Sequence, residues 1–330
     1  MINRLAKTPN AKFVRLGLQN FPVIPMHRRR ALVFAGGLGY CAMVTLACLL
    51  VALTIGDSRA MAQSLASDWI PGHNVRTRLV AGQLPTANSG SSPAGASLAA
   101  GLEIELSPGW KTYWRIPGDA GGVPPEFDWS ESENVTSVDV RYPAPKRLTD
   151  SAGSTIGYKE HVMFPVLINA KDATRPVKLR LIFAFGVCRD ICVPSEGTYE
   201  LTIPPNGAPQ SPEIVSALAL VPKPQATAKD EAKPTTPRLT KVEADLAAKE
   251  PKVAMHVLFP GGVEGGDVFV EGPVGEYVPM TVPTGKDADG AQVFVIELAK
   301  GADVAALKGK PLRVTMVSNA GHAETSFTLK

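Results

Sequence analysis

The sequence predicts an all-β protein built from antiparallel sandwiches and preceded by a segment that lies outside the fold. Pro and Gly are both abundant, with 29 and 30 residues in a chain of 330, and long helical patterns are few. Short stretches of alternating apolar and polar residues recur along the chain, with turn residues between them. Short strands at such spacing are typical of an antiparallel β-sandwich. The length leaves room for two domains.

Residues 1–62 have the pattern of an export signal. The basic cluster Arg28–Arg30 is followed by an uncharged, mostly apolar run from Ala31 to Gly56 and then by the small-residue site Ala60–Ala62. Together these features predict a secretory signal peptide cleaved after Ala62. The apolar run is also long enough to span a bilayer, so an uncleaved membrane anchor is the alternative. Both interpretations place residues from 63 onward outside the cytoplasm, in the periplasm.

The charge balance argues against nucleic acid as a partner. The formal net charge of +3 is misleading, because residues 1–62 hold eight Lys and Arg against one acid. The remaining residues carry 26 bases and 30 acids, and they show no basic stripe. No phosphate-binding loop, Ser/His/Asp arrangement or carboxylate pair is recognisable, so we predict neither a cofactor nor a resident metal. His73 and His161 are expected to be ordinary surface or strand residues.

Residues 63–205 form the first predicted domain, a series of short strands. Turn residues such as Ser107–Gly109 and Pro117–Asp119 lie between the strands. Three tryptophans, Trp110, Trp114 and Trp129, are expected to pack in the core or against turns, because aromatic side chains carry much of a core's burial. The predicted strands are Val75–Gly82, Leu102–Leu106 continuing through Trp110–Arg115, Val135–Tyr142, His161–Ile168, Lys178–Val187 and Thr198–Ile203.

Residues 206–237 are predicted to connect this domain to a second one. Ser211 is a good N-cap and Pro212 suits the first helical position, so a short helix is expected at Glu213–Leu220. Lys223–Pro237 is rich in Pro, Lys, Ala and Thr and indicates a flexible linker. Residues 238–330 then form a second, smaller β-sandwich domain without cysteine and without recognisable chemistry. Its predicted strands are Val253–Phe259, Asp267–Glu271, Gln292–Leu298, Leu312–Ser318 and Ala323–Leu329.

One pair of cysteines remains outside the export segment. Cys41 and Cys48 lie within that segment, so only Cys188 and Cys192 belong to the exported part. Apolar residues alternate along the strand before them, which places Cys188 on the opposite face from that apolar row. The chain turns at Arg189–Ile191 and returns at Cys192. Two cysteines that flank a tight turn can reach bonding distance. The alternating apolar residues are Leu179, Leu181, Phe183, Phe185 and Val187.

Three roles are open for the pair. Disulfides form in an oxidising exported compartment, but closing a loop of five residues stabilises a fold by only roughly 2 kcal/mol. A sandwich of about 140 residues does not need so small a stabilisation. This argument favours an exchangeable redox bond over a structural one. Arg189, next to Cys188, could favour a thiolate. A structural disulfide is the first alternative. A Cu(I) site is the second, since thiolates suit Cu(I), although His256 and His322 fall in the other predicted domain.

Ordered stretches around the pair resemble one known family. In content and order they are similar to the periplasmic N-terminal domain of the disulfide reductase DsbD, and more closely to that of its relative ScsB. The resemblance covers about Ser67–Pro205, and in ScsB-like proteins a second β domain also follows. The matching stretches are Gly109–Arg115 (GWKTYWR), Pro117–Asp119 (PGD), Pro124–Trp129 (PPEFDW), Gly157–Glu160 (GYKE), Phe164–Val166 (FPV) and Gly186–Pro194 (GVCRDICVP).

This resemblance implies an immunoglobulin-like sandwich whose cysteine pair carries electrons. The pair would take them from a polytopic membrane disulfide reductase and pass them to periplasmic thioredoxin-like or disulfide isomerase proteins. Disulfide isomerisation, cytochrome c biogenesis and copper tolerance are the processes implied. Carried over by position, Cys188 and Cys192 are the exchanging pair, and Tyr113 and Tyr158 match aromatic positions near it.

The sequence departs from the family in two respects. In DsbD a capping loop carries an aromatic residue that shields the cysteines, whereas the matching stretch here, Thr149–Ile156, has no aromatic residue and only one acid, Asp150. Shielding of that kind is therefore not expected. The full reductase also carries a polytopic electron-transfer domain and a thioredoxin-like domain. Neither pattern is found here, so we expect a separate membrane partner.

Overall fold

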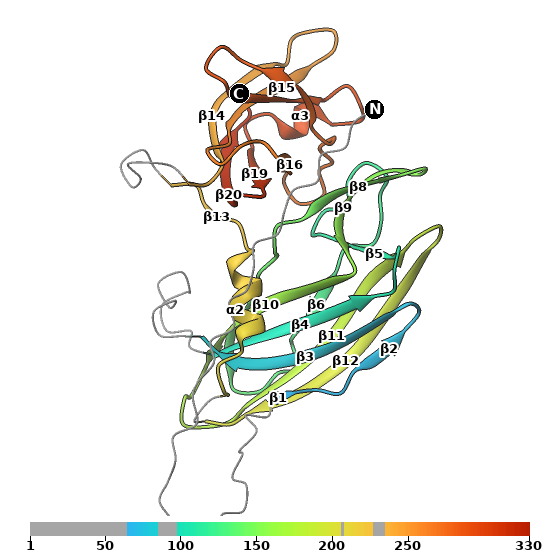
Figure 1. The fold of residues 1–330 in the computed structure, drawn as a ribbon, viewed down its shortest axis with the longest axis vertical. Helices are drawn as coiled ribbons and strands as arrows, with labels where there is room; N and C mark the ends of the chain where they lie inside the picture. Colours follow the sequence, from blue (N-terminus) through green and yellow to red (C-terminus); the bar gives the residue numbers. More distant parts are fainter. Residues whose placement is uncertain (1–64, 85–97, 206–207, 227–234) are drawn as a thin grey trace, which may run out of the picture. The chain divides into compact units, whose positions relative to one another are not determined.

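The computed structural model describes residues 65–84, 98–205, 208–226 and 235–330. They belong to one compact unit, Met61–Lys330. The predicted export signal at residues 1–62 lies outside the described residues. Within the described residues, no helix is long and apolar enough to cross a membrane. Antiparallel sheets make up most of the described chain (Figure 1), which confirms the all-β prediction.

Two six-stranded sheets form the first sandwich. One has the strand order β1-β3-β4-β10-β7, with β2 paired to β3, and the other has the order β12-β11-β5-β9-β8, with β6 paired to β11. Their strands are β1 (Leu65–Ala66), β2 (Ile70–Gly72), β3 (Val75–Gln83), β4 (Leu98–Leu106), β5 (Lys111–Tyr113), β6 (Glu126–Asp128), β7 (Val135–Val140), β8 (Lys146–Asp150), β9 (Gly153–Lys159), β10 (His161–Ala170), β11 (Val177–Cys188) and β12 (Cys192–Ile203).

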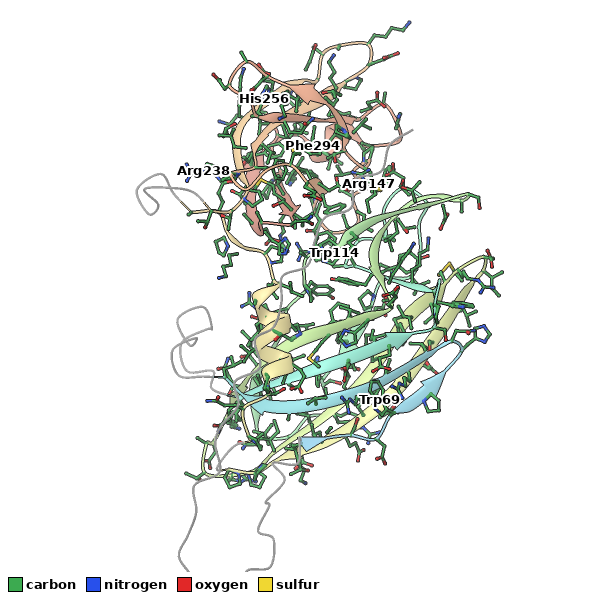
Figure 2. All side chains as sticks on the ribbon, viewed as in Figure 1. Trp69, Trp114, Arg147, Arg238, His256 and Phe294 are labelled. Carbon is green, nitrogen blue, oxygen red and sulfur yellow. A yellow bond between two sulfur atoms is a disulfide. The ribbon has the colours of Figure 1, made fainter. Side chains whose placement is uncertain are left out.

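The inner faces of these two sheets share one apolar core. Alternate residues of β11 point inward, so Phe183 and Phe185 are buried and stack with ring centroids 4.6 Å apart. Phe164 of β10 meets them through Phe127. Trp114, labelled in Figure 2, is fully buried in the same core, and Trp110 is nearly so. The expectation that the tryptophans pack in the core is confirmed.

The predicted short helix is present as α2 (Pro212–Ala219). Ser211 is its N-cap and accepts a hydrogen bond from the backbone N–H of Ile214. The apolar face of the helix packs on Met163 and Leu167 of β10, which covers the outer side of the first sheet. The helix therefore belongs to the first sandwich rather than to a connecting segment.

The linker prediction is wrong at its first residues. Lys223 and Pro224 form β13, which pairs in parallel with β20 (Gly321–Thr328), and the backbone N–H of Gln225 donates to the carbonyl of Glu324. Backbone pairing with a sheet edge overrides the linker-like composition, because the edge strand offers unpaired donors and acceptors. Residues 227–234 lie outside the described residues.

Two four-stranded sheets form the second sandwich. Their strand orders are β13-β20-β19-β16 and β14-β15-β18-β17. A separate apolar core, which includes Met255, Phe294 and Met316, lies between them. The short helix α3 (Val304–Leu307) follows the N-cap Asp303. The remaining strands are β14 (Arg238–Asp245), β15 (Lys252–Leu258), β16 (Asp267–Glu271), β17 (Val282–Lys286), β18 (Gln292–Glu297) and β19 (Pro311–Ser318).

A half-buried ion-pair network joins the end of β5 to the second sandwich. The guanidinium of Arg115 donates to both carboxylate oxygens of Glu271 at 2.6–2.9 Å and to Glu324 at 2.5 Å. It lies over the ring of Trp114 at 4.1 Å. The two carboxylates outweigh the cost of burial and raise the pKa of Arg115, so the charge is kept. This network fixes the backbone immediately after β5, the strand that carries two of the side chains described next.

Candidate functional site

The cysteine pair closes the long hairpin of β11 and β12. The two strands pair in unbroken register from Val177 and Ile203 to Cys188 and Cys192, as the side-by-side arrows in Figure 1 show. A disulfide joins this last pair, with the Cα atoms 4.1 Å apart. The backbone N–H of Arg189 donates to the carbonyl of Ile191 and closes the turn. The predicted position of the pair on the outer face of β11 follows from this register, because Val187 points into the core.

The two sulfurs differ in their access to solvent. Cys188 is 1% exposed, whereas Cys192 is exposed. Two exposed apolar side chains lie close to them: Ile191, in the turn, is 64% exposed, and Val123 is 39% exposed. The carbonyl of Val123 accepts a hydrogen bond from the N–H of Gly186, which holds that segment against β11. Cys192 is therefore the more accessible of the two cysteines.

The hydroxyl of Tyr113 contacts both sulfurs. It donates to the Sγ of Cys188 at 3.0 Å and lies 3.1 Å from the Sγ of Cys192. Burial raises the pKa of Tyr113, and the carboxylate of Asp150 raises it further. The phenol therefore keeps its proton near neutral pH and remains a donor.

Glycines allow the Tyr113 ring to lie so close to the backbone. A Cβ at Gly122 would fall 2.2 Å from two ring atoms, and the φ of Gly122 is 149°. A Cβ at Gly186 would lie 3.1 Å from the other edge of the ring. The ring is thus held between two glycines, of which Gly122 leaves no room for a side chain.

A buried lysine lies on the same face of the sheet. Lys111 of β5 pairs with Cys188 of β11 on one side and with Lys159 of β9 on the other. Its ammonium donates to the Oδ2 of Asp150 at 2.6 Å and to the Oγ1 of Thr155 at 3.1 Å. The bond from Lys111 lowers the pKa of Asp150, with help from the backbone N–H of Ala152.

The stretch that matches a capping loop is mostly a hairpin. Thr149–Ile156 lies in β8 and β9, which pair from Lys146 and Gly157 to Asp150 and Gly153. It carries no aromatic residue, as the sequence shows. The aromatic group against the sulfurs comes instead from β5, because Tyr113 and Cys188 lie on the same face of one sheet.

Of the predicted supporting residues, Tyr158 does not face the sulfurs. Tyr158 is a core residue: it pairs with Thr112 in register, packs on Phe164, and donates to the carbonyl of Pro143 at 2.8 Å. Side chains alternate along β5, so Tyr158 lies on the opposite face of the sheet from Tyr113. The guanidinium of Arg189 pairs with its neighbour Asp190 at 2.8 Å.

Arg189 also lies over the ring of Trp110, 5.4 Å from its centroid. Its charge is therefore shared with a carboxylate and an aromatic face. Lys111 was not singled out from the sequence. Its role depends on which residue of β5 pairs with Cys188, and no local pattern carries that information.

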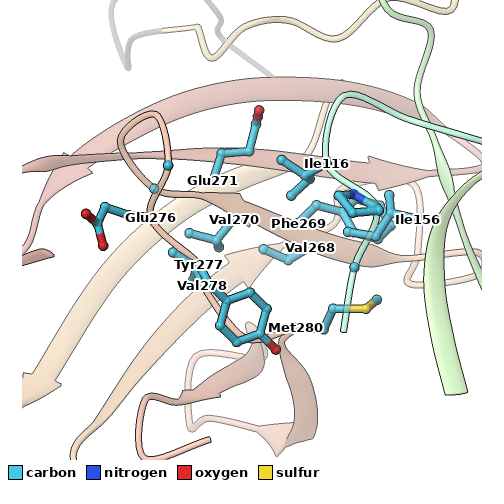
Figure 3. A pocket seen from close by; sticks show the side chains of 14 residues that line it. Ile116, Ile156, Val268, Phe269, Val270, Glu271, Glu276, Tyr277, Val278 and Met280 are labelled. Atoms are coloured by element: carbon cyan, nitrogen blue, oxygen red, sulfur yellow. The ribbon is translucent and has the colours of Figure 1, made fainter. Parts of the chain in front are cut away.

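A hollow of 250 Å³ has neither cysteine in its lining. It is lined mainly by apolar residues of both sandwiches, with Ile116, Ile156, Phe269 and Met280 around it (Figure 3). Among the described residues, no group of three or more His, Cys, Asp and Glu side chains is placed to hold a metal ion. His256 is held instead by two carboxylates, Asp287 at 2.6 Å and Glu243 at 2.9 Å.

Comparisons with known proteins give one family match and one similar crystal structure. Residues 83–204 match the family model of the N-terminal part of the thiol:disulfide interchange protein DsbD. No curated protein sequence was found to match the chain. A crystal structure of the N-terminal periplasmic domain of ScsB from Proteus mirabilis is similar, with a TM-score of 0.58 and 19% sequence identity.

The match to the ScsB structure extends beyond one sandwich. It covers 81% of this chain and 99% of that one. Residues 63–205 make up less than half of the chain, so the likeness in fold includes much of the second sandwich. The chain therefore has an all-β, immunoglobulin-like fold similar to that of the ScsB N-terminal periplasmic domain, with a DsbD N-terminal-like stretch at residues 83–204 and a second β-sandwich after it.

Proposed function

We propose that this protein is a thiol–disulfide exchange module of the bacterial periplasm, with Cys188 and Cys192 as its exchanging pair. The observation that carries the proposal is the asymmetry of the bond: Cys192 is exposed, Cys188 is buried, and a phenol contacts the sulfurs of both. The family match at residues 83–204 supports the same chemistry. We propose export through residues 1–62 and domains at 63–205 and 238–330.

The reducing half of the cycle begins at the exposed sulfur. A thiolate of the electron donor attacks the Sγ of Cys192 and forms a mixed disulfide, while the bond between Cys188 and Cys192 breaks. Its electron pair leaves on the Sγ of Cys188. The donor's second thiolate then attacks the donor sulfur in the mixed disulfide, and Cys192 leaves as a thiolate.

Each cycle transfers two electrons. The donor dithiol becomes a disulfide, and the two protons that it loses balance those taken up by Cys188 and Cys192. The same steps in reverse reduce the disulfide of an acceptor. Tyr113 donates to the departing thiolate of Cys188, and a hydrogen bond to a charged acceptor is stronger than one to a neutral acceptor.

The partners are part of the proposal. Cys188 and Cys192 are the one thiol pair among the described residues, and we propose that other proteins supply the donor and the acceptor thiols. We propose a polytopic membrane disulfide reductase as donor and periplasmic thioredoxin-like or disulfide isomerase proteins as acceptors. The acceptors would then serve disulfide isomerisation, cytochrome c biogenesis or copper tolerance. The exposed side chains of Ile191 and Val123 would meet a partner that docks at Cys192.

Trapping tests the proposal. In protein whose Cys41 and Cys48 are replaced by Ser, Cys188→Ser leaves the exposed Cys192 as the attacking thiol, whereas Cys192→Ser leaves the buried Cys188. We expect the first variant to accumulate a mixed disulfide with a thioredoxin-like partner, and the second to accumulate much less. If neither variant forms a mixed disulfide, and replacing both cysteines lowers only the melting temperature, the disulfide serves only to stabilise a turn. The proposed exchange function is then wrong.

A further inference from the structure

The site contains a buried charge that the exchange steps above do not use. The side chain of Lys111 is 7% exposed. Lysine is almost never so buried unless it is paired, because an ammonium loses much of its hydration free energy there. Asp150 and Thr155 accept two of its three N–H groups. The third has no protein acceptor among the residues that the structure describes.

The register of the sheet places the base of this side chain beside the buried cysteine, while its ammonium extends to Asp150 of β8 and Thr155 of β9. Lys111 and Cys188 are directly opposed across β5 and β11. Directly opposed residues point to the same face of a sheet, with Cβ atoms about 4.5–5.5 Å apart. Tyr113, two residues further along β5, lies on that face as well and contacts both sulfurs. Lys111, Tyr113 and Cys188 thus form one cluster on the outer face of the sheet.

The charge of Asp150, the partner of Lys111, acts on the group that touches the sulfurs. The carboxylate of Asp150 raises the pKa of Tyr113, so its field reaches the phenol, and the ammonium that binds Asp150 lies on the same side. Other charges nearby are Lys159, the exposed neighbour of Lys111 on β9, and the pair formed by Arg189 and Asp190 in the turn. Of the three cations, only that of Lys111 is buried.

We propose that Lys111 is a positioning residue for the exchange reaction: its buried ammonium, held by Asp150 and Thr155, stabilises the thiolate that Cys188 becomes when the disulfide opens. Asp150 acts in the opposite sense, because its negative charge offsets that of the ammonium. This inference rests on the proposed function and adds to it the residue that makes Cys188 the better leaving group. Lowering the pKa of the leaving thiol speeds attack on the other sulfur.

The test measures the acidity of Cys188 directly. In a Cys192→Ser background that also lacks Cys41 and Cys48, the ultraviolet absorbance of the thiolate is followed against pH. Lys111→Met is expected to raise the pKa of Cys188 by about one unit, the lower end of what a neighbouring opposite charge contributes. Asp150→Asn is expected to lower it, because the ammonium is then no longer offset.

Two further variants separate charge from structure. Lys111→Arg keeps the charge and is expected to hold the pKa of Cys188 near that of the parent. Thr155→Val removes one of the two hydrogen bonds that hold the ammonium without changing any charge, and it is expected to move the pKa of Cys188 by less than Lys111→Met does. A purely structural Lys111 would instead leave the pKa of Cys188 the same in Lys111→Met and in Asp150→Asn, or move it in the same direction in both. Either of these results overturns the inference.

The result is independent of partner exchange. Opposite shifts in Lys111→Met and Asp150→Asn support the role of Lys111 even if no mixed disulfide can be trapped, in which case the proposed function fails alone. If a mixed disulfide is trapped at Cys192 but the pKa of Cys188 is the same in Lys111→Met and Asp150→Asn as in the parent, only the inference about Lys111 is wrong. Circular dichroism of each variant establishes that the fold is kept before its titration is interpreted.

Discussion

The hydroxyl of Tyr113 donates a hydrogen bond to the Sγ of Cys188 over 3.0 Å. The two residues come from β5 and β11, which are adjacent in the sheet. This contact places a protonated donor on the sulfur that carries negative charge once the disulfide opens. It also covers the buried side of a bond whose other sulfur, on Cys192, is exposed.

Removing this donor should slow exchange. Tyr113→Phe keeps the ring and deletes the hydroxyl, so the departing thiolate of Cys188 loses a hydrogen bond. Hydrogen bonds to charged groups contribute about 1.5–3 kcal/mol, so the rate of disulfide exchange should fall by about tenfold or more. Stopped-flow reduction by a small dithiol measures the rate.

Tyr158→Phe is the matched control. It also deletes one buried phenol oxygen, which donates to the carbonyl of Pro143 in the core. We expect it to lower the free energy of unfolding by about 1–3 kcal/mol, since a buried carbonyl loses its partner, and to leave the exchange rate unchanged. Equal rates in the two variants would mean that the contact of Tyr113 with sulfur has no role in exchange.

The glycine against the Tyr113 ring should tolerate no side chain. Gly122→Ala would place a Cβ 2.2 Å from the ring, so the ring or the backbone has to move. We expect a loss of about 2 kcal/mol in the free energy of unfolding, as for overpacking, together with slower exchange.

Gly121→Ala is the comparison for that variant. Gly121 also has a positive φ, of 71°, but nothing lies within 4 Å of its would-be Cβ. Gly121→Ala should lower the free energy of unfolding by only about 1 kcal/mol, the cost of backbone strain. It should leave the exchange rate unchanged. Urea denaturation of both variants checks the difference, and the same loss in both would show that the ring contact is not tight.

Stability should pass through a maximum near pH 6.5. The hydrogen bond to Asp287, and after it the bond to Glu243, raises the pKa of His256 above its ordinary value of 6.5. The stability that this group contributes is fully present below about pH 6.5, and it is lost as the pH rises through the folded-state value. Burial lowers the pKa of His322. Below about pH 6.5 the unfolded chain therefore binds a proton at this residue more readily than the folded protein does, and the free energy of unfolding falls.

The two histidines can be separated by substitution. His256→Gln should flatten the fall in the free energy of unfolding above about pH 6.5, and His322→Gln should flatten the rise below it. Urea denaturation at half-unit steps from pH 5.5 to 8.5 measures both limbs. A profile that His256→Gln leaves unchanged above pH 6.5 would contradict the double carboxylate contact.

The sequence predicts the core-forming strands well because their patterns are local. The alternation from Leu179 to Val187 gives β11, its inward face and the outward position of Cys188, and the structure agrees. The helix α2 is found within one residue of its predicted bounds, because its start is set by Ser211 and Pro212. In both cases a physical signal lies within a few residues of the element that it determines.

The missed strands lack such a signal. β14 has one half-buried apolar residue in its middle, Val242, among charged neighbours, and it forms because β15 offers it an edge. β8 and β9 run through Thr149–Ile156, a stretch of small and polar residues that resembles a loop in composition. Lys111 was missed for the same reason, since its pairing with Cys188 is a property of the assembled sheet.

The reduction potential of the bond between Cys188 and Cys192 tests the central claim most directly. Purified protein with Cys41 and Cys48 replaced by Ser would be equilibrated with glutathione buffers, and the oxidised fraction measured by thiol labelling. An exchanging pair predicts a potential near or above roughly −250 mV, in the range of working dithiols. A value below about −300 mV is that of a structural disulfide, and it would contradict the exchange function.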